Sequence, residues 1–319
     1  MFEIDRIYNE ECINGMKRIP DGSVDAVICD LPYGTMRGID NKHDWDVVIP
    51  TKDLFDSYER VLRRGGVAIL FSQEPYTSHL RTFNAHNMAF CYPLIWKKNT
   101  AGNALMAKKA PISYFEDMNV FVKVADSANV YPLRQYAKMV MQFTGKNGCT
   151  MEKELAARGV EKPWELHHFI AGDAYTNIRI TSECAYNMLI KYYGIDKMDG
   201  FLTYSELKEI DAEYKRKYGR TFNLPDGKAS ISNILEYPKD KDGFHPTQKP
   251  IALIQQLVET YSNPGDTILD NCMGSGTTAI ACLRSNRHYI GFEMNCEYYE
   301  KATQRVQHEK SNPLLFGPN

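Results

Sequence analysis

Residues 267–279 read TILDNCMGSGTTA, and this segment passes from a short apolar run through a glycine-rich loop into helix-forming residues. We expect a strand over 267–270 and a helix over 277–283. Glycines let a backbone turn sharply and approach a ligand closely, and an acidic residue that ends the following strand can hold ribose hydroxyls. Glu293, at the end of the apolar run 288–293, takes that place. The segment indicates either a nucleotide site, since it fits the loose fingerprint G-x-G-x-x-A, or a tight turn that needs glycine.

Four further apolar runs lack the polar alternation of a half-exposed strand: 24–29, 67–71, 90–96 and 119–122. Residues with helical spacing lie among them at 54–62 and recur at 251–261. Strands of this kind, joined by helices, are typical of a mostly parallel sheet with helices on both faces. The sequence therefore predicts an α/β fold.

The pattern changes between 125 and 236, where strand-like runs nearly vanish and short helical stretches end at glycine. The clearest stretch is 205–218, before which Thr203 and Glu206 fit a capping box. Within it, Asp211 and Lys215 form a favourable pair one turn apart. We therefore expect two halves of an α/β core, 1–124 and 237–319, with a helical insertion over 125–236.

The composition excludes several classes of protein. The 319 residues carry a formal charge of −2, so nucleic-acid binding would need local basic patches rather than a basic field over the whole molecule. The eight cysteines include no C-x-x-C pair, which argues against a disulfide framework and a zinc site. Since no apolar run approaches the roughly 20 residues of a membrane span and the N-terminal residues do not resemble a signal peptide, we expect a cytoplasmic protein.

The motif Asp30-Leu31-Pro32-Tyr33-Gly34 follows the first of the apolar runs. A carboxylate, a rigid turn with an unpaired carbonyl and an aromatic ring can together grip a planar amine, but Asp, Pro and Gly are also ordinary turn residues. A third motif, HPTQKP at 245–250, precedes the glycine loop. The three motifs together are much more specific than any one of them.

These motifs resemble those of the amino-methyltransferases that act on exocyclic nitrogens of DNA bases. Residues 30–33 are similar to the D-P-P-Y catalytic motif, 272–276 to the F-x-G-x-G loop for S-adenosylmethionine, and 245–250 to the H-P-T-Q-K-P segment. A catalytic motif, then an insertion, then the cofactor motif is the order of the family's β class. The resemblance covers 1–124 and 237–307, and it implies a permuted, Rossmann-like methyltransferase sheet.

The resemblance also implies which residues form the site, with Lys249 near the methionine carboxylate of S-adenosylmethionine, Glu293 on its ribose and no metal. Two departures from the family pattern are Leu31, which keeps the backbone carbonyl that the family uses, and Cys272, which replaces a phenylalanine beside the cofactor. The catalytic residues would be Asp30, Leu31, Pro32 and Tyr33. The cofactor-binding residues would be Asp270, Cys272, Met273, Gly274, Ser275, Gly276, Thr277, Thr278, Glu293, Lys249 and His245.

The chemistry of the target defines the expected mechanism. The exocyclic amine of adenine is a poor nucleophile because its lone pair is delocalised into the ring. The base must first leave the duplex stack, which costs a few kcal/mol. Stacking on Tyr33 would recover about 1–3 kcal/mol of this. The Asp30 carboxylate and the Leu31 carbonyl would accept the two amine hydrogens, so that the lone pair points at the sulfonium methyl group.

DNA is the expected partner, and the insertion is expected to read the target sequence. The sequence leaves open whether the chain forms a homodimer and whether a partner endonuclease exists. Neutralising phosphates would make DNA affinity fall steeply with salt. The candidate phosphate contacts are Lys97, Lys98, Lys108, Lys109, Lys215, Arg216, Lys217 and Arg220.

The main hypothesis is a DNA adenine-N6 methyltransferase, because an aspartate at the start of the catalytic motif favours adenine and serine is commoner in relatives that act on cytosine N4. Cytosine N4 remains the nearest alternative. A nicotinamide-dependent oxidoreductase would explain the glycine loop but not the segments 30–33 and 245–250. A DNA-binding protein that has lost catalysis is a third alternative, and the intact Asp30 and Tyr33 argue against it.

Overall fold

The computed structural model describes the chain with a few gaps, and its contacts divide the chain into two compact units. One unit is Met1–Val124 with Arg220–Asn319, and the other is Ala125–Gly219. Residues 220–236, which the sequence analysis assigned to the insertion, thus belong to the α/β unit, because 234–236 form a strand of its sheet. The described residues are 3–34, 46–100, 108, 111–124, 131–166, 169–170, 180–240 and 248–311.

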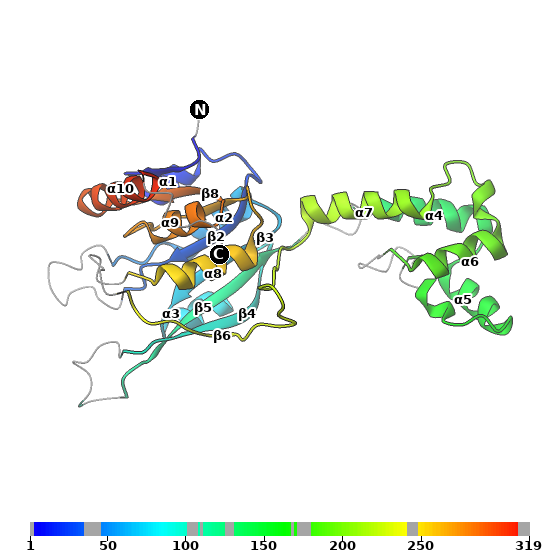
Figure 1. The fold of residues 1–319 in the computed structure, drawn as a ribbon, viewed down its shortest axis with the longest axis horizontal. Coiled ribbons are helices and arrows are strands. Elements are labelled where there is room, and N and C mark those ends of the chain that lie inside the picture. Colours follow the sequence, from blue (N-terminus) through cyan, green and yellow to red (C-terminus); the bar gives the residue numbers. More distant parts are fainter. Residues whose placement is uncertain are drawn as a thin grey trace. The chain divides into compact units, whose positions relative to one another are not determined.

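An eight-stranded sheet forms the centre of the first unit (Figure 1). Its strands are β1 (Arg6–Tyr8), β2 (Val24–Asp30), β3 (Leu62–Ser72), β4 (Met88–Lys97), β5 (Phe115–Lys123), β6 (Ile234–Glu236), β7 (Thr267–Asp270) and β8 (His288–Phe292). Their order in the sheet is β1-β8-β7-β2-β3-β5-β4-β6. Strand β5 is antiparallel to both of its neighbours, and the other pairs are parallel. The prediction of a mostly parallel sheet is confirmed.

Helices cover both faces of this sheet (Figure 1). Successive side chains of β2 show why its sequence is apolar throughout. Ala26 and Ile28 pack in one cluster with α8, α9 and α10, whereas Val27 and Cys29 pack in another with α1, α2 and α3. The helices are α1 (Cys12–Met16), α2 (Thr51–Val61), α3 (Tyr76–Thr82), α8 (Ile251–Tyr261), α9 (Thr277–Arg284) and α10 (Cys296–Ser311). Within the described ranges, none of the helices combines the length and the apolar content that crossing a membrane requires.

Strand β3 begins earlier than the sequence indicated. We expected a helix through Leu62 and a strand from Val67, but the strand already starts at Leu62 and includes both intervening glycines. A Cβ atom on Gly66 would lie 2.9 Å from the Arg63 carbonyl oxygen and 3.0 Å from that of Asp25. The glycine therefore permits a close approach to β2 at a point where the pairing register shifts.

The second unit is helical, as expected for the insertion, and contains α4 (Leu133–Thr144), α5 (Gly148–Ala157), α6 (Glu183–Tyr193) and α7 (Tyr204–Tyr218). It has a buried apolar core of its own, which includes Leu133, Leu155, Phe169, Tyr186 and Leu207. The predicted capping box is present at the start of α7, and the predicted pair of Asp211 with Lys215 forms at 2.7 Å.

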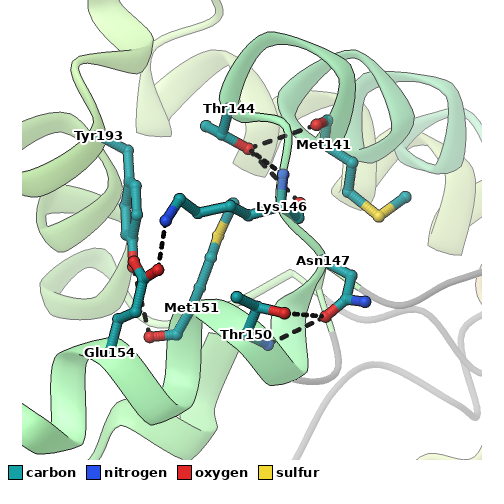
Figure 2. Close-up of polar contacts among 8 residues, drawn as sticks. All are labelled: Met141, Thr144, Lys146, Asn147, Thr150, Met151, Glu154 and Tyr193. Carbon is teal, nitrogen blue, oxygen red and sulfur yellow. Dashed lines mark hydrogen bonds and ion pairs between the residues drawn. The ribbon is translucent and has the colours of Figure 1, made fainter.

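Polar contacts join helices α5 and α6 within this unit (Figure 2). Glu154 on α5 accepts a hydrogen bond from the Tyr193 hydroxyl on α6 at 3.1 Å and pairs with the Lys146 ammonium group. Asn147 caps α5 by accepting from the Thr150 backbone N–H at 2.9 Å. These contacts fix helix ends around the core and belong to the folding of the unit.

Candidate active site

The expected site residues of the α/β unit lie along one edge of its sheet. Asp30 and Asp270 end the neighbouring parallel strands β2 and β7, and Glu293 directly follows β8. In parallel α/β sheets, the carboxyl ends of the strands form the ligand-binding edge. All three side chains line one cavity of about 740 Å³, which lies in the size range of small-molecule sites.

Two carboxylates shape the glycine loop. Asp270 accepts hydrogen bonds from the Cys272 backbone N–H at 3.1 Å and from the Thr278 hydroxyl at 2.6 Å. Glu293 accepts from the Gly274 backbone N–H at 2.9 Å. Burial raises the pKa of Asp270 to about 6, and burial also raises the pKa of Glu293. The ends of β7 and β8 therefore hold the loop between them.

Glycine is required at the start of α9. Gly276 has φ of +78°, and a Cβ atom there would lie 3.3 Å from the Cβ of Ala302 on α10. Gly276 is not among the residues that line the cavity, and its positive φ turns the chain into α9. Its neighbours Cys272, Met273, Gly274, Ser275, Thr277 and Thr278 all line the cavity.

The residues of the cavity fit the nucleoside part of S-adenosylmethionine. Glu293 supplies a carboxylate that can accept from ribose hydroxyls at the end of β8. The wall beside it contains the sulfur atoms of Cys12, Cys29 and Cys272. Burial raises the pKa of Cys29 to about 12, so its thiol is neutral at physiological pH and acts as an apolar surface. The pKa of the Cys272 thiol is likewise raised well above its ordinary value, so Cys272 keeps this part of the wall apolar although it replaces the phenylalanine of the family pattern.

Asp30 lines the same cavity with one oxygen engaged and the other without a partner. Its Oδ2 lies 2.5 Å from the Lys249 ammonium nitrogen. Its Oδ1 is covered from water and makes no hydrogen bond with any described residue. Burial raises the pKa of Asp30 to about 6, Lys249 opposes this rise, and the nearby Glu116 adds to it. A buried acceptor without a partner is uncommon in folded proteins and is satisfied when a bound molecule donates to it.

Lys249 is held by two carboxylates rather than left exposed toward a cofactor carboxylate. In addition to Asp30, its ammonium nitrogen lies 3.2 Å from Oε2 of Glu116, an ion pair without hydrogen-bond geometry. Burial disfavours the charge of Lys249, but Asp30 and Glu116 raise its pKa. Burial likewise opposes the ionisation of Glu116, yet Lys249 and Lys98 hold the pKa of Glu116 below its usual value.

Glu116 is a residue of the site that the sequence analysis did not assign. It lies near the start of β5, the antiparallel strand, so the amino end of this strand reaches the edge where the parallel strands end. The prediction that Lys98 is a surface phosphate contact is wrong, because its side chain is 3 % exposed and pairs with Glu116. The sequence features that could have indicated this ion pair are the two lysines before Asn99 and the glutamate after Phe115.

The rest of the catalytic motif lines the same cavity. Leu31 is buried, Pro32 and Tyr33 are half-buried, and all three line the cavity. Burial raises the pKa of the Tyr33 hydroxyl well above its ordinary value, and the charge of Asp30 adds to this rise. The ring is therefore a neutral surface beside the Asp30 carboxylate.

The other predicted DNA contacts are divided between the two units. In the α/β unit, Lys97 is exposed and pairs with Glu236 at 2.8 Å, Lys108 is exposed, and the Arg220 guanidinium lies over the Tyr92 ring. In the helical unit, the exposed Lys215 pairs with Asp211. Lys109 and His245 lie outside the described residues, as do the side chains of Arg216 and Lys217.

Among the described residues, no group of three or more His, Cys, Asp and Glu side chains is arranged to hold a metal ion. The carboxylates of Asp30 and Glu116 are paired with lysines, and those of Asp270 and Glu293 accept hydrogen bonds from the glycine loop. The arrangement can hold a nucleoside against the glycine loop and offer a carboxylate and an aromatic ring to a second group in the same cavity.

Comparisons with known proteins agree with this geometry. The chain is 26% identical over 329 residues to the type II methyltransferase M.HindIII of Haemophilus influenzae, covering 97% of each chain. It is 39% identical over 79 residues to the DNA adenine methyltransferase YhdJ of Escherichia coli, covering 23% of this chain and 27% of YhdJ. The fold resembles the crystal structure of the M1.HpyAVI–SAM complex with a TM-score of 0.52, at 17% identity and covering 94% and 98% of the two chains.

The model of the DNA methylase family N6_N4_Mtase matches residues 24–304, which include the catalytic motif, the insertion and the glycine loop. This match extends over most of the chain, and it sets the oxidoreductase interpretation of the loop aside. The chain belongs to the N6/N4 family of DNA methyltransferases.

Proposed function

We propose that this DNA methyltransferase transfers the methyl group of S-adenosylmethionine to the N6 amine of an adenine that has left the duplex stack. The observation that carries the proposal is the shared cavity. Asp30, with an oxygen that lacks a partner, lines the same cavity as the glycine loop and Glu293. An amine acceptor and a nucleoside-binding loop in one cavity are what a direct transfer needs.

The chain's own residues have three tasks in this reaction. When bound, the cofactor supplies an electrophilic methyl group on a sulfonium ion, and its sulfur leaves as a neutral thioether. Asp30 and the Leu31 carbonyl accept hydrogen bonds from the amine, which favours a tetrahedral nitrogen with its lone pair free to attack, and the methylated nitrogen then gives up one proton to the Asp30 carboxylate. Tyr33 stacks on the base and recovers about 1–3 kcal/mol of the unstacking cost. Positioning and electrostatics then provide the rate.

Two observations favour adenine over cytosine. The catalytic motif begins with aspartate, which in the family favours adenine, and the relative YhdJ is named a DNA adenine methyltransferase. Cytosine N4 is the alternative, since its exocyclic amine presents the same pair of hydrogens to Asp30 and Leu31.

Incubation with labelled S-adenosylmethionine and DNA of mixed sequence, followed by mass analysis of the nucleosides, tests both parts of the proposal. We expect N6-methyladenine from the wild type. In Asp30→Ala, we expect transfer to fall by at least about 100-fold, since a preorganised polar group at a reacting centre contributes that much. Binding of S-adenosylhomocysteine should persist in this variant. The exposed residue Asp56, which pairs with Lys52, provides a matched control as Asp56→Ala with full activity.

Each other outcome has a distinct meaning. N4-methylcytosine in place of N6-methyladenine would overturn the choice of base. A wild type that binds DNA without transferring label would overturn the enzymatic proposal in favour of a DNA-binding protein. Equal loss of transfer and of cofactor binding in Asp30→Ala would refute the role assigned to Asp30.

A further inference from the structure

The Asp30 carboxylate, whose side chain is 22 % exposed, ends a row of four charged groups, and the other three groups are buried. Lys249 lies between Asp30 and Glu116, at 2.5 Å and 3.2 Å, and Glu116 in turn pairs with Lys98. The side chains of Lys98, Lys249 and Glu116 are 3 %, 6 % and 9 % exposed. Two positive and two negative charges therefore alternate in a place from which water is largely excluded.

Four different segments bring this row together. Asp30 ends β2, Lys98 follows β4, Glu116 lies near the start of β5, and Lys249 precedes α8. Aromatic rings lie under both ammonium groups: the Lys249 nitrogen is 5.3 Å from the centre of the Phe71 ring, and the Lys98 nitrogen is 5.1 Å from that of Trp96. The rings attract the two ammonium groups through cation–π contacts and help to cover them from water.

Burying charged groups is costly, and such a row rarely improves stability over apolar residues of similar size. The row instead has a clear effect on the carboxylate at its end. Lys249 engages Oδ2 of Asp30, and Oδ1 is left without a described partner. A carboxylate held by one oxygen cannot rotate freely, so its second oxygen stays at a defined place.

We infer that Lys249, anchored by Glu116 and through it by Lys98, is a positioning residue that holds the Asp30 carboxylate in a fixed orientation for the target amine. This inference rests on the proposed function. It differs from the role that the resemblance gave Lys249, because the ammonium group lies between two carboxylates of the chain itself.

The row also affects the ionisation of Asp30, because the charged groups around Asp30 either favour or oppose its negative charge. Lys249 and Lys98 favour the ionised form, whereas Glu116 and the neighbouring Asp270 on β7 oppose it. Tyr33 remains neutral, and Lys239 lies near Lys98, Glu116 and Lys249 at the cavity wall. Removing the charge of Lys249 must therefore raise the pKa of Asp30, and removing that of Glu116 must lower it.

The test follows the titration of Asp30 directly, without DNA or cofactor. The protein is labelled with ¹³C at the aspartate carboxyl groups, and the Asp30 signal is identified by its loss in Asp30→Asn. We expect a midpoint near pH 6 in the wild type. In Lys249→Met, the midpoint should rise by about 1–3 pH units, the usual effect of an opposite charge at this range. In Glu116→Gln, it should fall by a smaller amount.

Lys52→Met is the matched control, because Lys52 forms an equally short pair with Asp56, 2.5 Å, on the exposed surface of α2. Its Asp30 midpoint should equal that of the wild type. In the working enzyme, kcat is measured against pH for the wild type and both variants. An acid-side midpoint of kcat that shifts in the same direction as the Asp30 midpoint of each variant would support the inference. In both Lys249→Met and Glu116→Gln, the Kd for S-adenosylhomocysteine should stay within about threefold of that of the wild type.

An unchanged midpoint in Lys249→Met overturns the inference, and so does a midpoint that rises in Glu116→Gln. The second variant decides the question alone if Lys249→Met fails to fold. An unchanged midpoint together with a large loss of cofactor affinity would assign Lys249 to the cofactor instead. Because the titration needs no turnover, a wild type without methyl transfer would refute the proposed function and leave this test standing.

Discussion

At the scale of single residues, Glu293 has two tasks in one side chain. Its Oε2 accepts from the Gly274 backbone N–H at 2.9 Å and its Oε1 from that of Asn295 at 2.8 Å. Each carboxylate oxygen retains further capacity to accept, so the same group can shape the loop and hold ribose hydroxyls. Hydrogen bonds to a charged group contribute about 1.5–3 kcal/mol, so Glu293→Ala should raise the Kd for S-adenosylhomocysteine by about 10- to 100-fold.

Isothermal calorimetry measures this effect. The control is Glu297→Ala on α10, where the glutamate is exposed and pairs with Lys301 outside the cavity. We expect the control to bind as the wild type does. Unchanged affinity in Glu293→Ala would remove this residue from the cofactor site.

The sequence predicted some residues of the site and missed others for a physical reason. Asp30, Asp270 and Glu293 each end an apolar run, and the carboxyl ends of parallel strands meet at one edge whatever their order. Glu116 comes from the start of an antiparallel strand, which this rule does not place. Lys98 was expected at the surface because lysines are rarely buried, and its pairing with a glutamate 18 residues away is visible only in three dimensions.

At the scale of elements, α7 shows what local signals can predict. Thr203 accepts from the Glu206 backbone N–H at 3.3 Å, and the Glu206 carboxylate accepts from the Thr203 N–H at 2.7 Å. Loss of an N-cap costs about 0.5–2 kcal/mol, so Thr203→Ala should lower the free energy of unfolding of the helical unit by that amount. Urea unfolding followed by circular dichroism measures this change.

The control is Ser205→Ala, at an exposed position inside the same helix, which should change the free energy of unfolding little. An equal loss of stability in both variants would contradict the role of Thr203 as the cap.

Other elements depended on packing and could not be predicted in the same way. Strand β6 has three residues, of which only the middle one, Leu235, is buried. Because the exposed Ile234 is also apolar, the sequence does not show the alternation of polar and apolar residues that would mark a strand. It belongs to the sheet because it pairs with the end of β4, which is more than a hundred residues earlier in the chain. Because of this pairing, the helical unit ends at 219 rather than at the expected 236.

At the scale of the whole molecule, charge is distributed evenly between the two units. Residues 125–219 contain 13 Lys and Arg and 13 Asp and Glu, so the insertion is formally neutral. A neutral unit cannot bind phosphates through a general basic field. If the insertion recognises the DNA target, as the sequence leads us to expect, its phosphate contacts come from local basic residues rather than from its net charge, and its share of the salt dependence of binding follows the number of those contacts.

Removal of the insertion separates recognition from chemistry. The residues that line the cavity all belong to the α/β unit, and the helical unit has a core of its own. We therefore expect a variant with 125–219 replaced by a flexible glycine–serine linker to bind S-adenosylhomocysteine with a Kd within about threefold of that of the wild type, because the replacement removes no residue that lines the cavity. Methylation at the preferred site, measured by sequencing the labelled positions, should disappear.

Full-length Asp30→Ala provides the converse control, with site-selective DNA binding retained and transfer lost. A shortened variant that still methylates the same sequence would show that the α/β unit itself reads the target, and one that folds but has lost cofactor binding would show that the cavity depends on the insertion.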